Sequence, residues 1–280
     1  GLERGRRIRI NGANASAESL LDYLRVLWLT PAMDGLFTGP AGDRRRFLDR
    51  LVLAADPGHG RRVTDLEKLL ASRNRLLDED AEPALLNAIE TQLAEMALAV
   101  ALARAETVEL LTGRIAAQGA DGAGFPVATL AMAGDFEARY LGAPASQGED
   151  AYRNALAKNR ARDRAAGRTL EGPHRSDLAV VFAEKDMPAA LSSTGEQKTL
   201  LIGLILAHAG LVAQISGMTP VLLLDEVAAH LDPDRRSALF VRLAQLGCQA
   251  VMTGTDAALF AGTHTGLQHF HVQAGEIGPA

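Results

Sequence analysis

Two adjacent carboxylates follow an uninterrupted apolar run in the last third of the chain. The run extends from Val221 to Leu224 and leads directly into Asp225 and Glu226. Such a run is typical of a central strand that is buried on both faces, and ligands of open α/β sheets bind at the carboxyl ends of their strands. The pattern indicates that Asp225 holds Mg²⁺ through water and that Glu226 polarises a water attacking a γ-phosphate. The alternative is an apolar strand that ends in a solvated acidic turn.

A second segment, Ser192 to Thr199, places small and hydroxyl-bearing residues and a glycine ahead of a long apolar run. Backbone N–H groups at the start of a helix bind phosphate closely when the side chains there are small. We expect a phosphate-binding surface at this helix start, formed by Ser193, Thr194, Gly195, Glu196 and Gln197. The Ser193 hydroxyl would add a hydrogen bond to the phosphate. An ordinary serine-capped helix explains the same residues equally well.

A third segment, Ala229 to Asp232, would carry Asp232 from a loop toward a neighbouring site. Asp232 followed by Pro233 is also a favourable N-cap and first-turn pair of a helix. The dipeptide Lys198-Thr199 does not belong to a phosphate-binding loop, because the sequence contains no G-x-x-x-x-G-K-[ST] pattern.

Basic residues gather in one stretch of a chain whose net charge is −5. Between Tyr152 and Arg175 the only acids are Asp163 and Glu171, against a stripe of basic residues: Arg153, Lys158, Arg160, Arg162, Arg164, Arg168 and Arg175. Lys and Arg neutralise phosphates and release counterions, so the stripe predicts sequence-independent, salt-sensitive DNA binding. A solvated helix face with internal ion pairs is the alternative. A second candidate DNA contact is the cluster Arg44, Arg45 and Arg46.

The chain that must position these residues has 280 residues, enough for one large domain or two modest ones. Its single cysteine, Cys248, excludes an internal disulfide and fits a reducing cytoplasm. The uncharged run from Thr199 to Leu224 is interrupted by Gly217 and Pro220, which favours a buried helix and strand over a membrane span. The start at Gly1, without Met or a signal-peptide pattern, suggests a fragment.

The spacing of apolar residues predicts two kinds of structure. Residues 1 to about 60 are mixed, with a strand at 7–10, an Asn11-Gly12 turn and a helix from Asp43. From about 63 to 111 a heptad seam predicts two helices joined at a polar break before Pro83, as an antiparallel hairpin; a plain helical bundle is the alternative. The seam of the second helix comprises Leu86, Ile89, Leu93, Met96, Val100, Ala103, Thr107 and Leu110.

Beyond residue 112 the pattern is first ambiguous and then regular. We expect a strand at 125–130, a polar helix at 151–165, and strands at 169–170 and 178–182. The last third alternates between helices after Gly195 and Pro233 and strands at 221–224, 249–253 and 270–272, with a short helix at Asp256. Such alternation predicts a parallel α/β sheet.

The order and spacing of the three motifs resemble the C-terminal half of an ABC-class head ATPase. The signature matches Ser193 to Gln197, the Walker B strand Val221 to Asp225, the catalytic acid Glu226, and the D-loop His230 to Asp232. Further stretches, covering nearly the whole chain, are similar to the RecF family: Arg44 to Asp49, Leu69 to Asn74, and Thr169 to Leu178. Ser176 stands where that family more often has Asp.

The resemblance implies an α/β, ABC/SMC-like P-loop ATPase head with an inserted antiparallel helical coiled-coil arm, lacking the N-terminal Walker A segment. It divides the chain into the remainder of ATPase lobe I (1–60), a helical arm subdomain (61–150) and ATPase lobe II (151–280). It also implies a cytoplasmic protein of recombinational repair and replication, which takes ATP and Mg²⁺ and helps load recombinase at gaps. RecR and RecO are its expected partners.

In such proteins two heads dimerise head-to-tail around ATP and bind double-stranded DNA and single-strand–duplex junctions. The resemblance implies slow hydrolysis by the intact protein and little or none by a fragment without Walker A. Two other classes compete. A tethering head of the SMC or Rad50 kind would need a much longer arm, and a transporter nucleotide-binding subunit would carry a compact helical subdomain before the signature.

Overall fold

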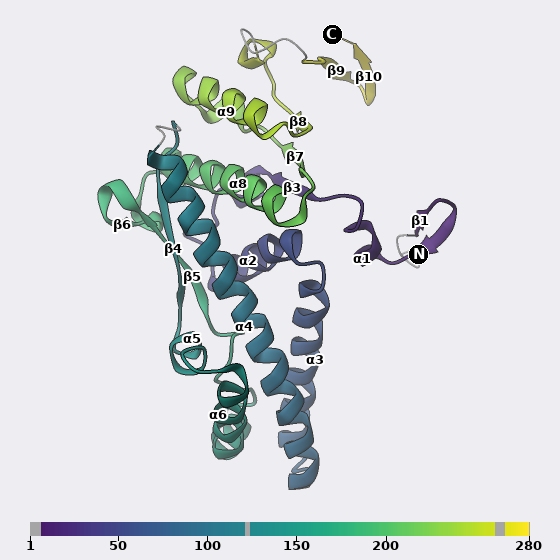
Figure 1. Cartoon of the computed structure of the whole chain (residues 1–280), viewed down its shortest axis with the longest axis vertical. Helices are drawn as coiled ribbons and strands as arrows, with labels where there is room; N and C mark the ends of the chain where they lie inside the picture. Colours follow the sequence, from purple (N-terminus) through teal and green to yellow (C-terminus); the bar gives the residue numbers. More distant parts are fainter. Residues whose placement is uncertain (1–6, 121–123, 261–266, 280) are drawn as a thin grey trace.

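The computed structural model describes residues 7–120, 124–260 and 267–279. A helical hairpin projects from a body that contains two three-stranded sheets (Figure 1). The first sheet is parallel, in the order β3 (Val26–Leu29), β7 (Val221–Leu224) and β8 (Ala250–Met252). The predicted strand at 221–224 is therefore confirmed, and it lies in the centre of this sheet.

The two faces of the parallel sheet differ. Inward-facing residues such as Leu27 and Leu222 join buried residues of α8 (Thr194–Ser216) and α9 (Pro233–Leu246) in one core cluster. The other face carries Trp28, Leu223 and Val251, which are aligned across the three strands and are 39%, 40% and 50% exposed. Because parallel sheets are normally covered on both faces, this open apolar row is an unpartnered surface.

The second sheet is antiparallel, in the order β4 (Ala128–Ala133), β5 (Asp177–Phe182) and β6 (Met187–Pro188). Helix α2 (Ala41–Ala55) packs on β5 through the predicted apolar face that includes Phe47 and Leu51. The remaining short elements are β1 (Ile8–Ile10), β2 (Ala13–Ala15), α1 (Ala17–Leu20), β9 (Phe270–Gln273), β10 (Glu276–Pro279) and the 3-10 turns Pro31–Met33, Ala183–Lys185, Ala189–Leu191, Ala228–His230 and Ala257–Phe260.

The predicted hairpin, which we call the arm, consists of α3 (His59–Asp78) and α4 (Pro83–Ala120), packed side by side (Figure 1). Helices α5 (Asp135–Tyr140), α6 (Ala145–Lys158) and α7 (Arg160–Ala165) lie at its side, with α6 against α4 and α7 against α3. Leu66, Leu93 and Tyr152 belong to the core of this assembly. The arm is therefore a braced hairpin rather than a free coiled coil.

The heptad seam of α4 ends earlier than predicted. Leu93 and Val100 are fully buried, but Leu110 is 44% exposed and its neighbour Leu111 is buried instead. A straight α-helix drifts relative to a seven-residue repeat, and the C-terminal part of α4 turns its buried face toward β4 and α8. The prediction for Leu110 was wrong for this reason.

Several strand predictions also need correction. Residues 169–170 form no strand, because Thr169 is held by side chains of the arm. The strand expected at 125–130 is β4, which begins three residues later. Of the strands predicted in the last third, β7 and β8 are parallel to β3, whereas β9 pairs with β10 in a separate hairpin. The strand predicted at 178–182 is β5, which lies in the antiparallel sheet.

Two helices, Pro83–Gly119 and Thr194–Ser216, are long and apolar enough to cross a membrane by length and composition alone. The apolar window of α8 is 72% buried within the fold, as expected of the core helix predicted from this run. Helix α4 packs against α3, α6, α8 and β4.

Candidate nucleotide and DNA sites

The acidic end of β7 consists of Asp225 and Glu226, whose side chains are exposed. The Asp225 backbone N–H donates to the Leu29 carbonyl at 2.9 Å, which fixes this end against β3. Glu226 has a φ of 54°, in the left-handed region that non-glycine residues adopt at a strain of roughly 1–3 kcal/mol. Asp225 and Glu226 therefore leave the strand in a sharp turn, with both carboxylates at the carboxyl edge of the sheet.

The start of α8 is a capped helix. The Ser193 hydroxyl accepts from the Glu196 N–H, and the Ser193 N–H donates to the Glu196 carboxylate at 3.0 Å, forming a capping box. Glu196 is also paired with Lys185. The hydrogen bonds from Lys185 and then from Ser193 lower the pKa of Glu196 to about 2. The alternative of an ordinary capped helix thus describes the local hydrogen bonding.

Phosphate binding at this helix start is compatible with the cap. Ser193, Thr194 and Gly195 are exposed, and the space beside Gly195 is open: apart from its chain neighbours and the backbone of its own helix turn, no atom lies within 4 Å of the place a Cβ would take. Gln197, in contrast, points inward and donates to the Ser192 carbonyl at 2.8 Å. Its amide therefore stabilises the loop before the helix and is not presented to a ligand, contrary to the prediction for Gln197.

The helix start and the acidic end of β7 are joined through β3. Lys198, in the first turns of α8, donates to Asp34 at 2.8 Å, and Asp34 ends the 3-10 turn that follows β3. Because β3 and β7 are parallel and end side by side, both motifs are linked to the carboxyl end of β3: the acidic pair through the Asp225 N–H and the start of α8 through Asp34. Asp232 serves as the N-cap of α9, accepting from the Arg235 N–H at 2.9 Å, and remains exposed.

The cluster Arg44, Arg45 and Arg46 is divided between fold and surface. Arg44 binds Asp177 with two hydrogen bonds of 2.8 and 2.7 Å and also donates to carbonyls before α2. Burial alone would raise the pKa of Asp177, but these bonds from Arg44 lower it overall. Arg45 donates to the Ser176 carbonyl at 2.8 Å, whereas Arg46 is largely exposed. Arg44 and Arg45 therefore stabilise the fold.

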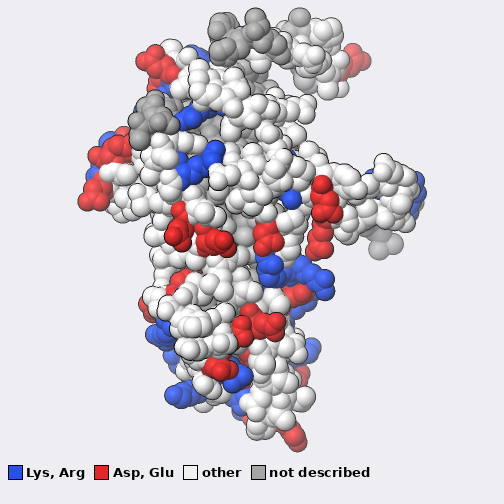
Figure 2. Space-filling model, viewed as in Figure 1, with Lys and Arg blue, Asp and Glu red and all other residues white. Residues whose placement is uncertain are grey.

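The basic stripe is divided in the same way. Arg160 is engaged by Glu90, and Arg164 is paired with the exposed Asp80. Lys158 and Arg175 are exposed and take part in no ion pair among the residues that the structure describes, and Arg162 lies 3.9 Å from Asp163. On the face drawn in Figure 2, acidic and basic side chains alternate over the arm instead of forming one basic surface.

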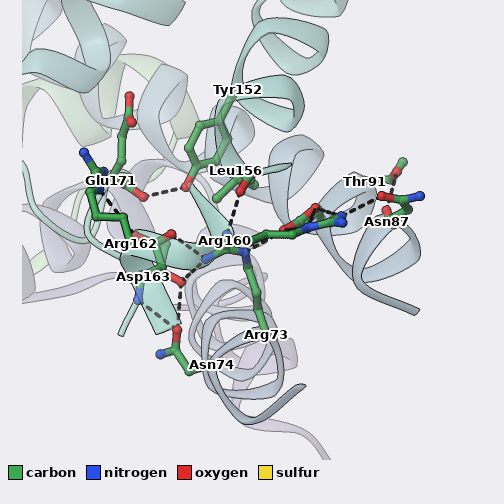
Figure 3. Close-up of polar contacts among 12 residues, drawn as sticks. Arg73, Asn74, Asn87, Thr91, Tyr152, Leu156, Arg160, Arg162, Asp163 and Glu171 are labelled. Carbon is green, nitrogen blue, oxygen red and sulfur yellow. Dashed lines mark hydrogen bonds and ion pairs between the residues drawn. The ribbon is translucent and has the colours of Figure 1, made fainter. Parts of the chain in front are cut away.

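A buried ionic group, which the spacing of basic residues did not predict, joins the arm to the segment 163–169. We call it the arm junction: Arg73, Asn74, Glu90, Asp163 and Thr169, of which Figure 3 labels Arg73, Asn74 and Asp163. Arg73 is fully buried and donates to Glu90 at 3.0 Å, Asp163 at 2.8 Å, the Thr169 hydroxyl at 2.7 Å and the Leu156 carbonyl at 2.8 Å. Asn74 accepts from the Thr169 N–H and hydroxyl. The sequence feature that could have pointed to this group is the stretch Leu69 to Asn74, which contains both Arg73 and Asn74.

The stretch Thr169 to Leu178 is a crossing point of the fold. Gly172 has a φ of 147°, and a Cβ there would meet the Tyr152 hydroxyl at 2.7 Å, so glycine is required. The Pro173 carbonyl accepts from Arg104 at 2.8 Å. Ser176 donates to Glu137 at 2.8 Å, where a carboxylate in place of the hydroxyl would be repelled. The role of this stretch is therefore structural: it contacts α4, α5 and α6.

Comparisons with known proteins agree with these features. No protein-family model matches the chain. The chain is 60% identical over 279 residues to the DNA replication and repair protein RecF of Mesorhizobium japonicum, a match that covers 99% of this chain and 73% of the relative. It is 56% identical over 278 residues to the RecF protein of Brucella suis, covering 99% and 72%.

Among solved structures, the recombination mediator protein RecF-ATPrS of the RecFOR pathway has a TM-score of 0.80 at 21% identity, covering 98% of this chain and 72% of that one. The RecF-ATP structure gives a TM-score of 0.79 at 22% identity. The fold, an α/β head with an inserted helical arm, is that of these solved RecF structures. The identity with its curated relatives shows that the chain belongs to the RecF family.

Proposed function

We propose that the chain is the DNA-binding part of a head that dimerises head-to-tail around ATP and acts as a recombination mediator. The observation that carries this proposal is that the Asp225–Glu226 turn and the open start of α8 are both hydrogen-bonded to the chain at and after the carboxyl end of β3. RecF relatives are named for DNA replication and repair, and a solved relative is described with ATP.

The residues at the sheet edge fit a nucleotide with Mg²⁺. Among the described residues, no group of three or more His, Cys, Asp and Glu side chains is placed to hold a metal. A metal beside Asp225 would therefore complete its shell with phosphate oxygens and water, as Mg²⁺ prefers. When bound, Mg²⁺ would neutralise charge on the phosphates. Glu226 would orient the attacking water of its own head, while Ser193, Thr194, Gly195 and Asp232 would face the nucleotide of the partner head.

The open row of Trp28, Leu223 and Val251 supports a further part of the proposal. This chain spans 73% of its Mesorhizobium relative, and we place the phosphate-binding loop in the remaining length. A lobe that carries this loop would cover the open row and supply the missing layer of the sheet. The 280-residue chain by itself is then expected to hydrolyse little or no ATP.

The test is ATP turnover by the protein at the full length of its relatives. We expect slow hydrolysis that falls by at least ~100-fold in Glu226→Gln, because that variant loses a general base. ATP-dependent dimerisation, followed by light scattering, should survive in Glu226→Gln and fail in Gly195→Trp, which fills the open space beside the helix start. Wild-type turnover in Glu226→Gln would contradict the proposed role of this acid.

DNA binding is assigned to the exposed basic residues Lys158, Arg162 and Arg175, with Arg46, which pairs with Asp43 but is 74% exposed, as a second contact. Replacing Lys158, Arg162 and Arg175 by Gln should weaken binding to duplex and junction DNA without sequence preference. The slope of log affinity against log salt should fall by about 0.9 for each phosphate that the variant no longer neutralises. Lys68→Gln, an exposed charge on α3, is the matched control. If the triple variant kept the parent's slope, these residues would not contact DNA phosphates and the proposed role of the basic stripe would be wrong.

RecR and RecO remain the proposed partners, and the cytoplasm the proposed location. The SMC or Rad50 type of tether is disfavoured by the arm, because α3 has only 20 residues, about 30 Å of helix.

A further inference from the structure

Thr253, just beyond β8, makes hydrogen bonds to three successive residues of the neighbouring strand end. Its N–H donates to the Leu224 carbonyl at 3.0 Å, which continues the parallel pairing of β7 and β8. Its hydroxyl donates to Oδ1 of Asp225 and accepts from the Glu226 N–H at 3.0 Å. One side chain thus contacts both members of the acidic pair.

The direction of these bonds determines what the hydroxyl does. A threonine hydroxyl has a single proton, and here Asp225 accepts it, so the same oxygen is free to accept from the Glu226 N–H. Oδ1 of Asp225 is thereby oriented by Thr253, and the other carboxylate oxygen is left for a metal ion. The bond to the Glu226 N–H fixes the backbone at the residue whose φ is 54°.

Burial does not account for this arrangement. Thr253, Asp225 and Glu226 are all exposed, so water would satisfy each polar group if the hydroxyl were absent. Water would not, however, hold the carboxylate and the strained turn in one fixed relation. The contribution of Thr253 is therefore expected in the geometry of the acidic pair rather than in the stability of the fold.

We propose that Thr253 is a positioning residue of the ATPase site, which orients Asp225 toward Mg²⁺ and fixes the turn that directs Glu226. This inference rests on the proposed nucleotide site. It assigns to β8 a task beyond pairing: the strand next to β7 carries the group that sets the position of both acids. Thr255, two residues further on, is exposed and offers a matched hydroxyl outside this network.

The test compares Thr253→Val, Thr253→Ser and Thr255→Val in the full-length protein. Val removes the hydroxyl at constant shape, and Ser retains it. We expect Thr253→Val to lower kcat roughly 10- to 100-fold with little change in KM for ATP, as for other groups that orient metal ligands. Thr253→Ser and Thr255→Val should remain close to wild type, and the unfolding midpoint should be the same in all of them.

A second readout is independent of turnover. Binding of Mn²⁺ in the presence of ATPγS, measured by electron paramagnetic resonance, should weaken roughly 10- to 100-fold in Thr253→Val and recover in Thr253→Ser. Wild-type kcat and Mn²⁺ affinity in Thr253→Val, alongside an inactive Glu226→Gln, would overturn this inference alone. An active Glu226→Gln would instead contradict the proposed function, and the role of Thr253 with it.

Discussion

At the arm junction, Arg73, Glu90 and Asp163 are each at most 1% exposed and have protein partners, whereas Asp225 and Glu226 at the end of β7 face solvent. In the arm junction, the ion pairs of Arg73 with Glu90 and Asp163 connect α3 to α4 and to the segment after α6. At the acidic end of β7, Thr253 is the one side chain among the described residues that hydrogen-bonds Asp225 or Glu226, and the turn there is strained. Charged residues that serve the fold are thus paired and buried, and those proposed to serve a ligand remain available.

The largest effect is expected from Arg73→Met. This change leaves Glu90 and Asp163 buried without their central cation, and breaking a buried ion pair from one side typically lowers the free energy of unfolding by about 3–5 kcal/mol. Chemical denaturation of the variant and the parent measures this difference directly. Far-UV circular dichroism should show that the variant still folds at low temperature.

The matched control is Arg164→Met, which breaks an exposed ion pair with Asp80 near the same end of the arm. Exposed pairs contribute about 0–1 kcal/mol, so this variant should be nearly as stable as the parent. Equal losses in the two variants would show that burial does not distinguish the junction from the surface.

A smaller, pH-dependent effect on the free energy of unfolding is expected from His208. Its ring is fully buried, its Nε2 bonds the Leu51 carbonyl at 2.9 Å, and burial lowers its pKa to about 4. Between its unfolded value of 6.5 and 4, the unfolded chain binds the proton and the folded chain does not. Stability from this residue is therefore present above pH 6.5 and is lost as the pH falls toward 4, by up to roughly 3 kcal/mol.

The measurement is the free energy of unfolding at several pH values between 7 and 4 for the parent, His208→Gln and His230→Gln. Gln keeps an N–H donor for Leu51 but does not titrate, so His208→Gln should lose less stability on acidification than the parent. Exposed His230 should make no difference. Carboxylates with lowered pKa values, such as Asp49, weaken all three proteins alike. Parallel curves for the parent and His208→Gln would exclude this residue as an acid-sensitive group.

The sequence predicted the elements whose signals are local. The apolar run before Asp225, the capped start of α8, the N-cap at Asp232 and the hairpin of α3 and α4 all follow from patterns within a few turns or residues. The Asn11-Gly12 turn likewise joins β1 to β2, with positive φ at both residues. Such features depend on the chain near them and little on what packs around it.

What could not be predicted depends on partners far apart in the chain. Arg44 was expected to face DNA, but its partner Asp177 is 133 residues away, and Arg160 meets Glu90 across 70 residues. A run of arginines does not disclose which members find a carboxylate in the folded state. The role of Arg73 could not be predicted for the same reason, because its partner Asp163 is 90 residues away. Strand β3 was not predicted either, since it is defined by its pairing with the distant β7, next to which the candidate site lies.

The smallest effect on the free energy of unfolding is expected from Glu226→Gly, and it is an increase where the earlier variants give a decrease. Glycine adopts a φ of 54° without a Cβ clash, so this variant should be more stable than the parent by about 0.5–1 kcal/mol, while hydrolysis is lost. Asp186→Gly, at a φ of 47° outside the site, should give a similar gain in stability and retain hydrolysis. Glu226→Gln separates the two effects, because it removes the base but keeps the strained backbone. A loss of stability in Glu226→Gly would mean that the glutamate side chain stabilises the turn, and the acidic end of β7 would then use a charged residue to support the fold, as the arm junction does.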